Sequence, residues 1–212
     1  RGDAEVDQGR TGSTGSGVTP HTVTASHPAR RIPGESGTWV FLFGDMLVFG
    51  AFFVTFLVER AKEPDVFDAA RTTLHLGVGV LNTVVLLTSS LFVVLALTAT
   101  RTGARTLATR AVVAAMGCGL VFIALKVFEY VSLAGAGHGP GANHFYLYYF
   151  ILTGLHLFHV CLGLGALAFM ATQTRRDELG ATRTALVEGA ACFWHLVDLL
   201  WIFLFALLYL VS

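Results

Sequence analysis

Long apolar stretches separated by short polar connections dominate the chain. Each is about as long as the roughly 20 residues that a helix needs to cross a bilayer, or longer. We therefore expect an all-α integral membrane bundle of five transmembrane helices. The stretches are Thr38–Val58, Val78–Thr100, Ala111–Ala134, Phe145–Thr172 and Gly189–Val211.

Residues 1–37 have a different composition. They are rich in Gly, Ser, Thr, Arg and Pro and contain no apolar run, so burial cannot offset the entropy of ordering them. We expect a disordered cytoplasmic tail over 1–37 and a membrane domain over 38–212. An apolar signal-peptide region is absent from the tail.

The composition narrows the function classes. The chain is 54% hydrophobic and 13% charged, about half the charged fraction of a soluble domain. This composition excludes a soluble enzyme and a disulfide scaffold. The net charge is zero, so no overall positive field favours binding to nucleic acid.

The three cysteines, Cys118, Cys161 and Cys192, lie within the spans and form no C-x-x-C pair. We expect each of them to fill space in the helix packing as a small apolar side chain.

Positive charges near the span ends predict the orientation. Lys and Arg favour the cytoplasmic side. Three lie on one side, Arg60, Lys62 and Arg71, which predicts that this side is external and that the amino terminus is cytoplasmic. Ten lie on the other side: Arg1, Arg10, Arg30, Arg31, Arg101, Arg105, Arg110, Arg175, Arg176 and Arg183.

Ionisable residues inside lipid cost a few kcal/mol each and usually face protein or water. Helix rise places Asp45, His159 and His195 at similar depths in the inner half, so we expect them to approach one another or a lipid headgroup. The pairs His156/His159 and His195/Asp198 are spaced i,i+3 and each share a helix face.

We expect Asp198 to accept the ring N–H of His195 and to fix its tautomer. Each of these histidines and Asp198, taken singly, could instead make only a hydrogen bond that packs two helices together, without a functional role. In the outer half, Lys126 and Glu129 are also spaced i,i+3, which predicts an intrahelical ion pair.

Three sets of residues carry simpler expectations. Polar residues of the second span should form interhelical hydrogen bonds, namely Asn82, Thr83, Thr88, Ser89 and Ser90. Glycines of the third and fourth spans should permit close helix approach, namely Gly117, Gly119, Gly154, Gly163 and Gly165. Tyr146, Tyr148 and Tyr149, at the start of the fourth span, should form an interfacial belt.

The connection Lys62–Gly77 reads as amphipathic. Its Phe67 and Leu74 should lie at the membrane interface.

Each span contains one distinctive string. The strings are WVFLFGDMLVFGAFF, LNTVVLLTSS, LKVFEY, TGLHLFHVCLGLGAL and FWHLVDLLWIFLFALLYL. Together they resemble the heme-copper oxidase subunit III family. W-H-x-V-D together with G-x-H-x-x-H-V is the most specific combination. The chain resembles the five-helix form, which lacks the first two helices of larger members.

The resemblance implies an accessory, multi-pass subunit of the bacterial plasma membrane without heme or copper of its own. Redox centres would belong to catalytic subunit I, beside other respiratory subunits. The family's subunit III binds phospholipid and supports assembly and sustained proton-coupled electron transfer. Asp45 corresponds to the family's membrane-embedded carboxylate, often Glu. The resemblance also implies buried polar, lipid-related or proton-related roles for Glu129, His156, His159, His195 and Asp198.

Several alternatives stay open. Lys126 departs from the usual uncharged residue, and G-D-M, N-T-x-x-L-L-T-S-S and K-x-x-E-Y resemble the branch associated with nitric oxide reductase. The electron donor of the complex is cytochrome c or quinol. A membrane b-type cytochrome would use His159 and His195 as axial ligands, and a proton-coupled transporter would use Asp45, the histidines and Asp198 as a relay.

Overall fold

The computed structural model describes residues 36–174 and 180–210. These residues are helical apart from short turns, and the described part contains no strand. The helices are α1 (Ser36–Lys62), α2 (Pro64–Arg71), α3 (Leu76–Arg101), α4 (Arg105–Gly135), α5 (His144–Gln173), α6 (Ala181–Phe205) and the π-helical segment η1 (Ala206–Leu210).

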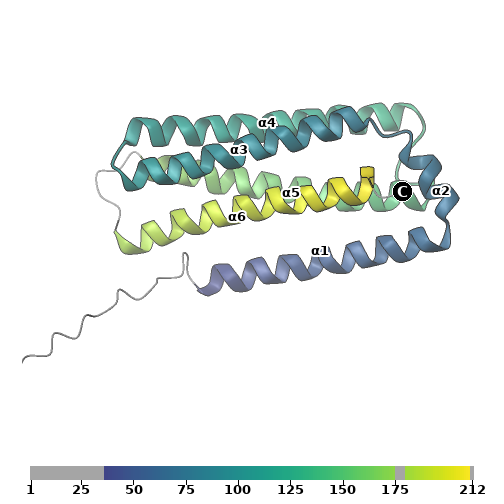
Figure 1. The fold of residues 1–212 in the computed structure, drawn as a ribbon, viewed down its shortest axis with the longest axis horizontal. Coiled ribbons are helices and arrows are strands. Elements are labelled where there is room, and N and C mark those ends of the chain that lie inside the picture. The colour runs from purple at the N-terminus through teal and green to yellow at the C-terminus, as the bar shows by residue number, and fades with distance from the viewer. Residues whose placement is uncertain (1–35, 175–179, 211–212) are drawn as a thin grey trace, which may run out of the picture. The chain divides into compact units, whose positions relative to one another are not determined.

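Five long helices run side by side, which confirms the five-span prediction (Figure 1). Their most apolar windows have mean hydropathies between 1.8 and 2.3. Short connections join consecutive long helices, so neighbours in the chain run in opposite directions. The protein is thus a multi-pass membrane protein. The expected tail lies outside the described residues, except that Ser36 and Gly37 begin α1.

The helices extend beyond the apolar stretches from which they were predicted. α4 begins six residues before Ala111, and α6 begins eight residues before Gly189. Polar residues continue a helix past the hydrocarbon layer because its backbone hydrogen bonds do not depend on lipid. The hydropathy pattern therefore identified the spans and underestimated the helix lengths.

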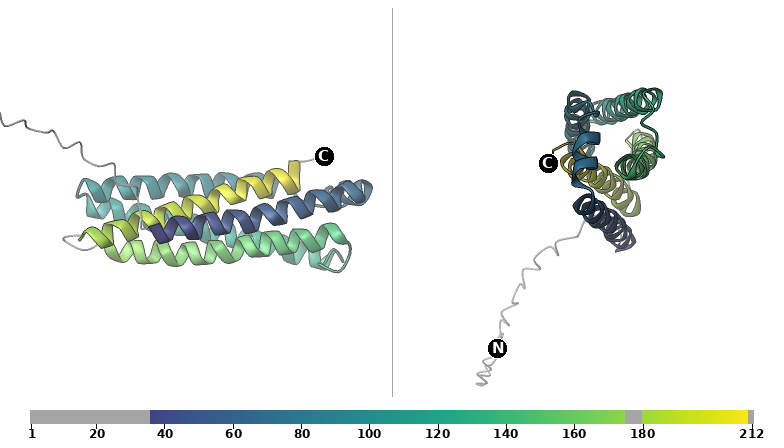
Figure 2. Two further views of the ribbon diagram at one scale, coloured as in Figure 1. Left: turned by 90° about the horizontal axis from the view of Figure 1, so that it is seen from below. Right: turned by 90° about the vertical axis from the view of Figure 1, so that its right-hand side faces the viewer.

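α1 is the least buried of the five long helices. Its buried apolar residues recur every seventh position, at Leu42, Phe49 and Phe56, and this stripe faces α5 and α6. The other faces are open, as at Leu47, which is 75% exposed. The end-on view shows α1 at the edge of the bundle beside α6, with α3 and α4 at the opposite edge (Figure 2).

Trp194 of α6 fills the centre of the bundle. It is fully buried, and a Cβ added at Gly119 or Gly163 would lie 2.9 Å or 2.6 Å from its ring. These two glycines therefore permit the close approach that we predicted. The prediction is wrong for Gly117, Gly154 and Gly165, since a Cβ there would have no neighbour within 4 Å.

α2 covers one end of the bundle. Its Phe67 is 2% exposed, and the Phe67 ring contacts Phe56 and Phe145 at centroid distances of 5.4 and 5.6 Å. Leu74 is also buried. The expectation that Phe67 and Leu74 lie at the membrane interface is therefore wrong, because both are buried in the protein core, Phe67 against aromatic rings of α1 and α5.

The tyrosines at the start of α5 also differ from the prediction. Tyr146 and Tyr149 are buried, and the Tyr146 hydroxyl is 2.7 Å from the Thr73 hydroxyl. An interfacial belt is thus wrong for these two residues, since their hydroxyls find partners inside the protein.

The orientation remains a prediction, and labelling tests it. In a chain whose three cysteines are replaced by Ala, we expect a membrane-impermeant maleimide added outside to label Ala142→Cys. Ala104→Cys, in the turn between α3 and α4, should react only after permeabilisation, because the positive charges place this turn in the cytoplasm. The reverse labelling pattern would contradict the orientation.

Candidate functional site: buried polar networks between the helices

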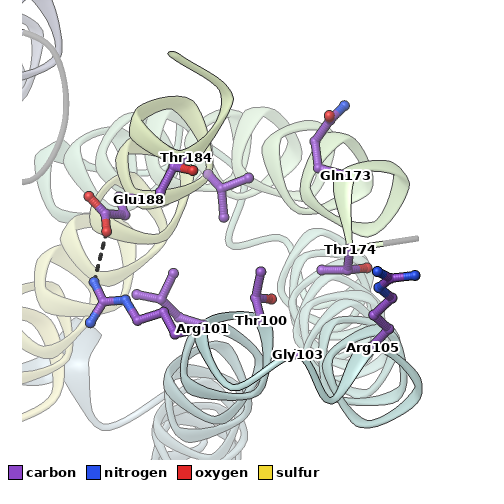
Figure 3. Close-up of a pocket in the computed structure, with 10 residues that line it drawn as sticks. Thr100, Arg101, Gly103, Arg105, Gln173, Thr174, Thr184 and Glu188 are labelled. Carbon is purple, nitrogen blue, oxygen red and sulfur yellow. Dashed lines mark hydrogen bonds and ion pairs between the residues drawn. The ribbon is translucent and has the colours of Figure 1, made fainter. Parts of the chain in front are cut away.

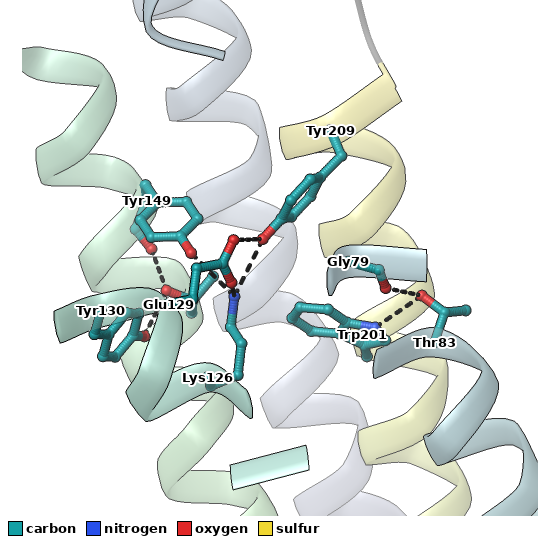
Figure 4. Close-up of polar contacts among 9 residues, drawn as sticks. Gly79, Thr83, Lys126, Glu129, Tyr130, Tyr149, Trp201 and Tyr209 are labelled. Atoms are coloured by element: carbon teal, nitrogen blue, oxygen red, sulfur yellow. Dashed lines mark hydrogen bonds and ion pairs between the residues drawn. The ribbon is translucent and has the colours of Figure 1, made fainter. Parts of the chain in front are cut away.

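A buried ion pair lies on α4. Lys126 and Glu129 are each 1% exposed, and Lys126 Nζ donates to Glu129 Oε2 at 2.8 Å. This confirms the predicted i,i+3 pair. Figure 4 shows that the pair lies between α5 and the end of α6.

Two tyrosines complete the coordination of the pair. Lys126 Nζ also donates to the hydroxyls of Tyr149, at 3.1 Å, and Tyr209, at 3.3 Å. The Tyr209 hydroxyl donates to Glu129 Oε1 at 2.7 Å. An ammonium group has three N–H donors, so each donor of Lys126 has an acceptor. We call these four residues the Lys126 network.

Aromatic rings surround the ammonium group as well. Lys126 Nζ lies 4.9 Å from the centroid of the Trp201 ring and 5.0 Å from that of Tyr149. Ring faces attract cations, and the attraction is larger where water is excluded. Tyr209 lies in η1, so the π-helical end of the chain supplies one ligand of the network.

A second polar contact joins α1 to α5. His159 Nε2 lies 3.0 Å from Asp45 Oδ1, and His159 Nδ1 lies 2.7 Å from the backbone oxygen of Leu155. A carbonyl oxygen only accepts, so Nδ1 carries a proton and donates it. One further proton must then lie between Nε2 and Oδ1, and the pair is net neutral. The predicted approach of Asp45 and His159 is confirmed.

His195 has a different partner from the one predicted. Its Nδ1 lies 2.7 Å from Ser90 Oγ on α3, and the oxygens of Asp198 have no hydrogen-bond partner among the described residues. The predicted pairing of His195 with Asp198 is wrong. Two residues on one helix face can serve different neighbours, and here α3 supplies a closer partner.

His156 is fully buried and makes no hydrogen bond to a described residue. Its ring lies 5.6 Å from Phe122 and 5.4 Å from Trp201, between centroids. His156 and His159 therefore have different surroundings despite their spacing. The first lies among aromatic rings, and the second binds α1.

Tryptophans of α6 use the hydroxyl groups of α3. Trp194 Nε1 donates to Ser89, at 3.1 Å, and Trp201 Nε1 donates to Thr83, at 3.0 Å. Interhelical roles are thus confirmed for Thr83, Ser89 and Ser90. They are wrong for Thr88, whose hydroxyl bonds within its own helix, and for Asn82, which has no partner among the described residues.

Two hollows flank α1. One, of about 300 Å³, lies between α1 and α6, with His195 on its otherwise apolar wall. The other, of about 390 Å³, lies on the far side of Leu42 and reaches Leu162 and Ala190.

A polar hollow of about 210 Å³ lies where α3 ends and α4 begins (Figure 3). Arg101 and Glu188 form an ion pair of 2.8 Å on its wall. Thr100, Thr174 and Thr184 also line it, and each of their hydroxyls bonds the backbone carbonyl of a residue three or four positions earlier. This polar character suits an end of the bundle that meets water.

Sequence reasoning missed Tyr149, Tyr209 and Ser90 as ligands of charged or titratable groups. A buried lysine needs three acceptors, and its carboxylate neighbour supplies only one of them here. That requirement could have directed attention to tyrosines at the same depth. It could not have selected Tyr209, whose position depends on the π-helical segment.

We expect strong coupling between Lys126 and Glu129. Lys126→Met or Glu129→Gln alone leaves a buried charge unpaired and should lower the free energy of unfolding by about 3–5 kcal/mol. The double variant removes both charges and should cost less than either single variant. Denaturation of the purified full chain in detergent measures this cycle.

The exposed pair Arg101–Glu188 provides the control. Arg101 is 61% exposed in its side chain, so Arg101→Met should cost at most about 1 kcal/mol. If the costs of the two Lys126 network variants simply add, the pair is not coupled and the prediction is wrong.

We also expect Asp45→Asn to be tolerated better than Asp45→Leu. An amide N–H can donate to His159 Nε2 in place of the shared proton, whereas leucine leaves the ring nitrogen unpartnered at a cost of about 1–3 kcal/mol. Thermal denaturation compares the two. Equal losses of stability would show that the shared proton is not replaceable by an amide donor.

Comparisons with known proteins identify relatives over the whole bundle. A family model described as cytochrome c oxidase subunit III matches residues 21–212. Cytochrome c oxidase subunit 3 of Thermostichus vulcanus is 31% identical over 191 residues, 88% of this chain and 90% of that protein. Cytochrome bo(3) ubiquinol oxidase subunit 3 of Pseudomonas putida is 31% identical over 181 residues, 83% and 84% of the two chains.

A third relative joins two subunits in its name. Heme-copper oxidase subunit I+III of Aeropyrum pernix is 25% identical over 183 residues, which are 84% of this chain and 22% of that protein. The family match includes all five spans and the residues of both buried polar contacts. The chain therefore belongs to the cytochrome c oxidase subunit III family.

Proposed function

We propose that the chain is an accessory subunit, without a redox centre of its own, of a respiratory heme-copper oxidase. The observation that carries this proposal is the family match over residues 21–212. The name of the Aeropyrum pernix relative supports catalytic subunit I as the partner. Relatives named as cytochrome c oxidase and ubiquinol oxidase subunits leave both electron donors open.

The geometry of the histidines supports this function over a b-type cytochrome. An axial ligand needs a free nitrogen lone pair for iron. Both ring nitrogens of His159 are engaged, by Leu155 and by Asp45. His195 bonds to Ser90 through Nδ1 alone. A heme held between His159 and His195 would therefore lack the axial ligand from His159.

Phospholipid is the ligand that the hollows beside α1 favour. Both hollows lie within membrane-spanning segments and have mostly apolar walls. Acyl chains in them would fill the space between α1 and the rest of the bundle. We therefore assign lipid binding to this region, with His195 as the titratable residue at its wall.

The Asp45–His159 pair is the strongest candidate for a proton-related role. It holds one shared proton inside the membrane, and the other carboxylate oxygen, Asp45 Oδ2, has no partner among the described residues. Glu129 belongs to the Lys126 network, where its charge is already compensated.

Two alternatives for the function of the chain remain predictions. One is that it is an accessory subunit of a nitric oxide reductase, and the other is that it is a proton-coupled transporter.

Deletion of the subunit tests the proposed function. In cells that lack this chain, the purified catalytic partner should keep its heme and copper content, because the redox centres belong to the partner. Its yield, or the number of turnovers before inactivation, should fall. Heme spectra, metal analysis and activity over time measure these quantities.

Re-expression of the unmodified chain is the control and should restore yield and turnover. Two results would contradict the proposal. One is stoichiometric heme or copper in the purified chain alone, and the other is a deletion that leaves assembly and turnover lifetime unchanged.

A further inference from the structure

In three residues of the spans, no polar side-chain atom has a hydrogen-bond partner among the described residues. They are Asn82, His156 and Asp198, which are 0%, 0% and 4% exposed. Asp45 and Gln173 differ, because each has one polar atom that is bonded and one that is not.

Trp201 relates the three residues in space. The His156 ring lies 5.4 Å from the Trp201 ring, between centroids. Trp201 Nε1 donates to Thr83, which follows Asn82 on α3 (Figure 4). Asp198 precedes Trp201 by three residues and shares its helix face. The three residues thus lie on the three helices that meet at Trp201.

Neighbouring protein groups are already engaged. The Ser90 hydroxyl lies 2.7 Å from His195 Nδ1. All three donors of Lys126 are used within its network, and the Trp201 N–H is bonded to Thr83. Lipid offers no hydrogen bonds, so a partner of another kind is required.

We propose that ordered water molecules bind between α3, α5 and α6 around Trp201 and hydrogen-bond to Asn82, His156 and Asp198. The chemistry of the site fits water, which both donates and accepts and makes about three hydrogen bonds when buried. The carboxyl and amide oxygens accept, the amide N–H groups donate, and the imidazole offers one donor and one acceptor.

Hydration distinguishes this site from the Lys126 network. Water beside His156 and Asp198 lets both residues exchange protons inside the membrane, whereas the Lys126 network is saturated by protein groups. The proposal of bound water holds whichever oxidase contains this chain, because it is argued from residues of this chain alone.

Water-edited solid-state NMR of the full chain in bilayers with deuterated acyl chains tests the site. Magnetisation transferred from water should reach the His156 ring nitrogens and the Asp198 carboxyl carbon at least about threefold faster than the indole nitrogen of Trp194. Trp194 is the matched control, because it is fully buried and its indole N–H is bonded to the Ser89 hydroxyl.

Difference spectra of His156→Gln and Asp198→Asn assign the two signals, and sequential backbone assignment of the unmodified chain replaces a variant that does not fold. Faster transfer to both residues than to the Trp194 indole nitrogen supports the site. Transfer to either residue at the rate of the Trp194 indole nitrogen overturns it.

Discussion

The cost of a charge in lipid determines where the helices of this bundle meet. Lys126 and Glu129 are buried within a span, where an uncompensated charge costs several kcal/mol. The compensating groups come from α5 and from η1 at the end of α6. These elements must therefore stand at one depth, because a slip of a single helical turn of about 5.4 Å would separate the hydroxyls from the ammonium group.

Fewer contacts hold α1 against the rest of the bundle. Its contacts with α5 and α6 include one stripe of buried apolar side chains, ring contacts of Phe41 and Phe53 with α6, and the hydrogen bond between Asp45 and His159. Hollows on both sides of Leu42 separate its first half from α5 and α6. Association of helices in a membrane gains little from the hydrophobic effect, since lipid is as apolar as the side chains. The contact between Asp45 and His159 thus adds specificity to the docking of α1 on α5.

The sequence predicted those features that depend on local spacing. Five apolar stretches long enough to span gave five helices, and the i,i+3 spacing of Lys126 and Glu129 gave their ion pair. Depth along the helices also predicted the meeting of Asp45 with His159. Features that depend on competition between helices were missed: His195 shares a face with Asp198, yet it bonds to Ser90.

The aromatic residues show the same limit. Tyr149 sits near a span end, where tyrosines commonly face the headgroups, and only the fold reveals that its hydroxyl binds a lysine 23 residues earlier in the chain. The position of Tyr209 is even harder to predict from the sequence, because it depends on a local change from α-helix to π-helix. Sequence spacing measures neighbours on one helix, whereas a buried charge is satisfied by several.

Polar residues in this bundle mostly connect helices. Trp194, His195 and Trp201 of α6 bind three hydroxyl groups of α3, and His159 binds α1. Each contact joins two helices through a group that would otherwise be buried without a hydrogen bond, at a cost of about 1–3 kcal/mol. These polar residues therefore determine which helices meet and at what depth, which apolar side chains cannot do against lipid that is equally apolar.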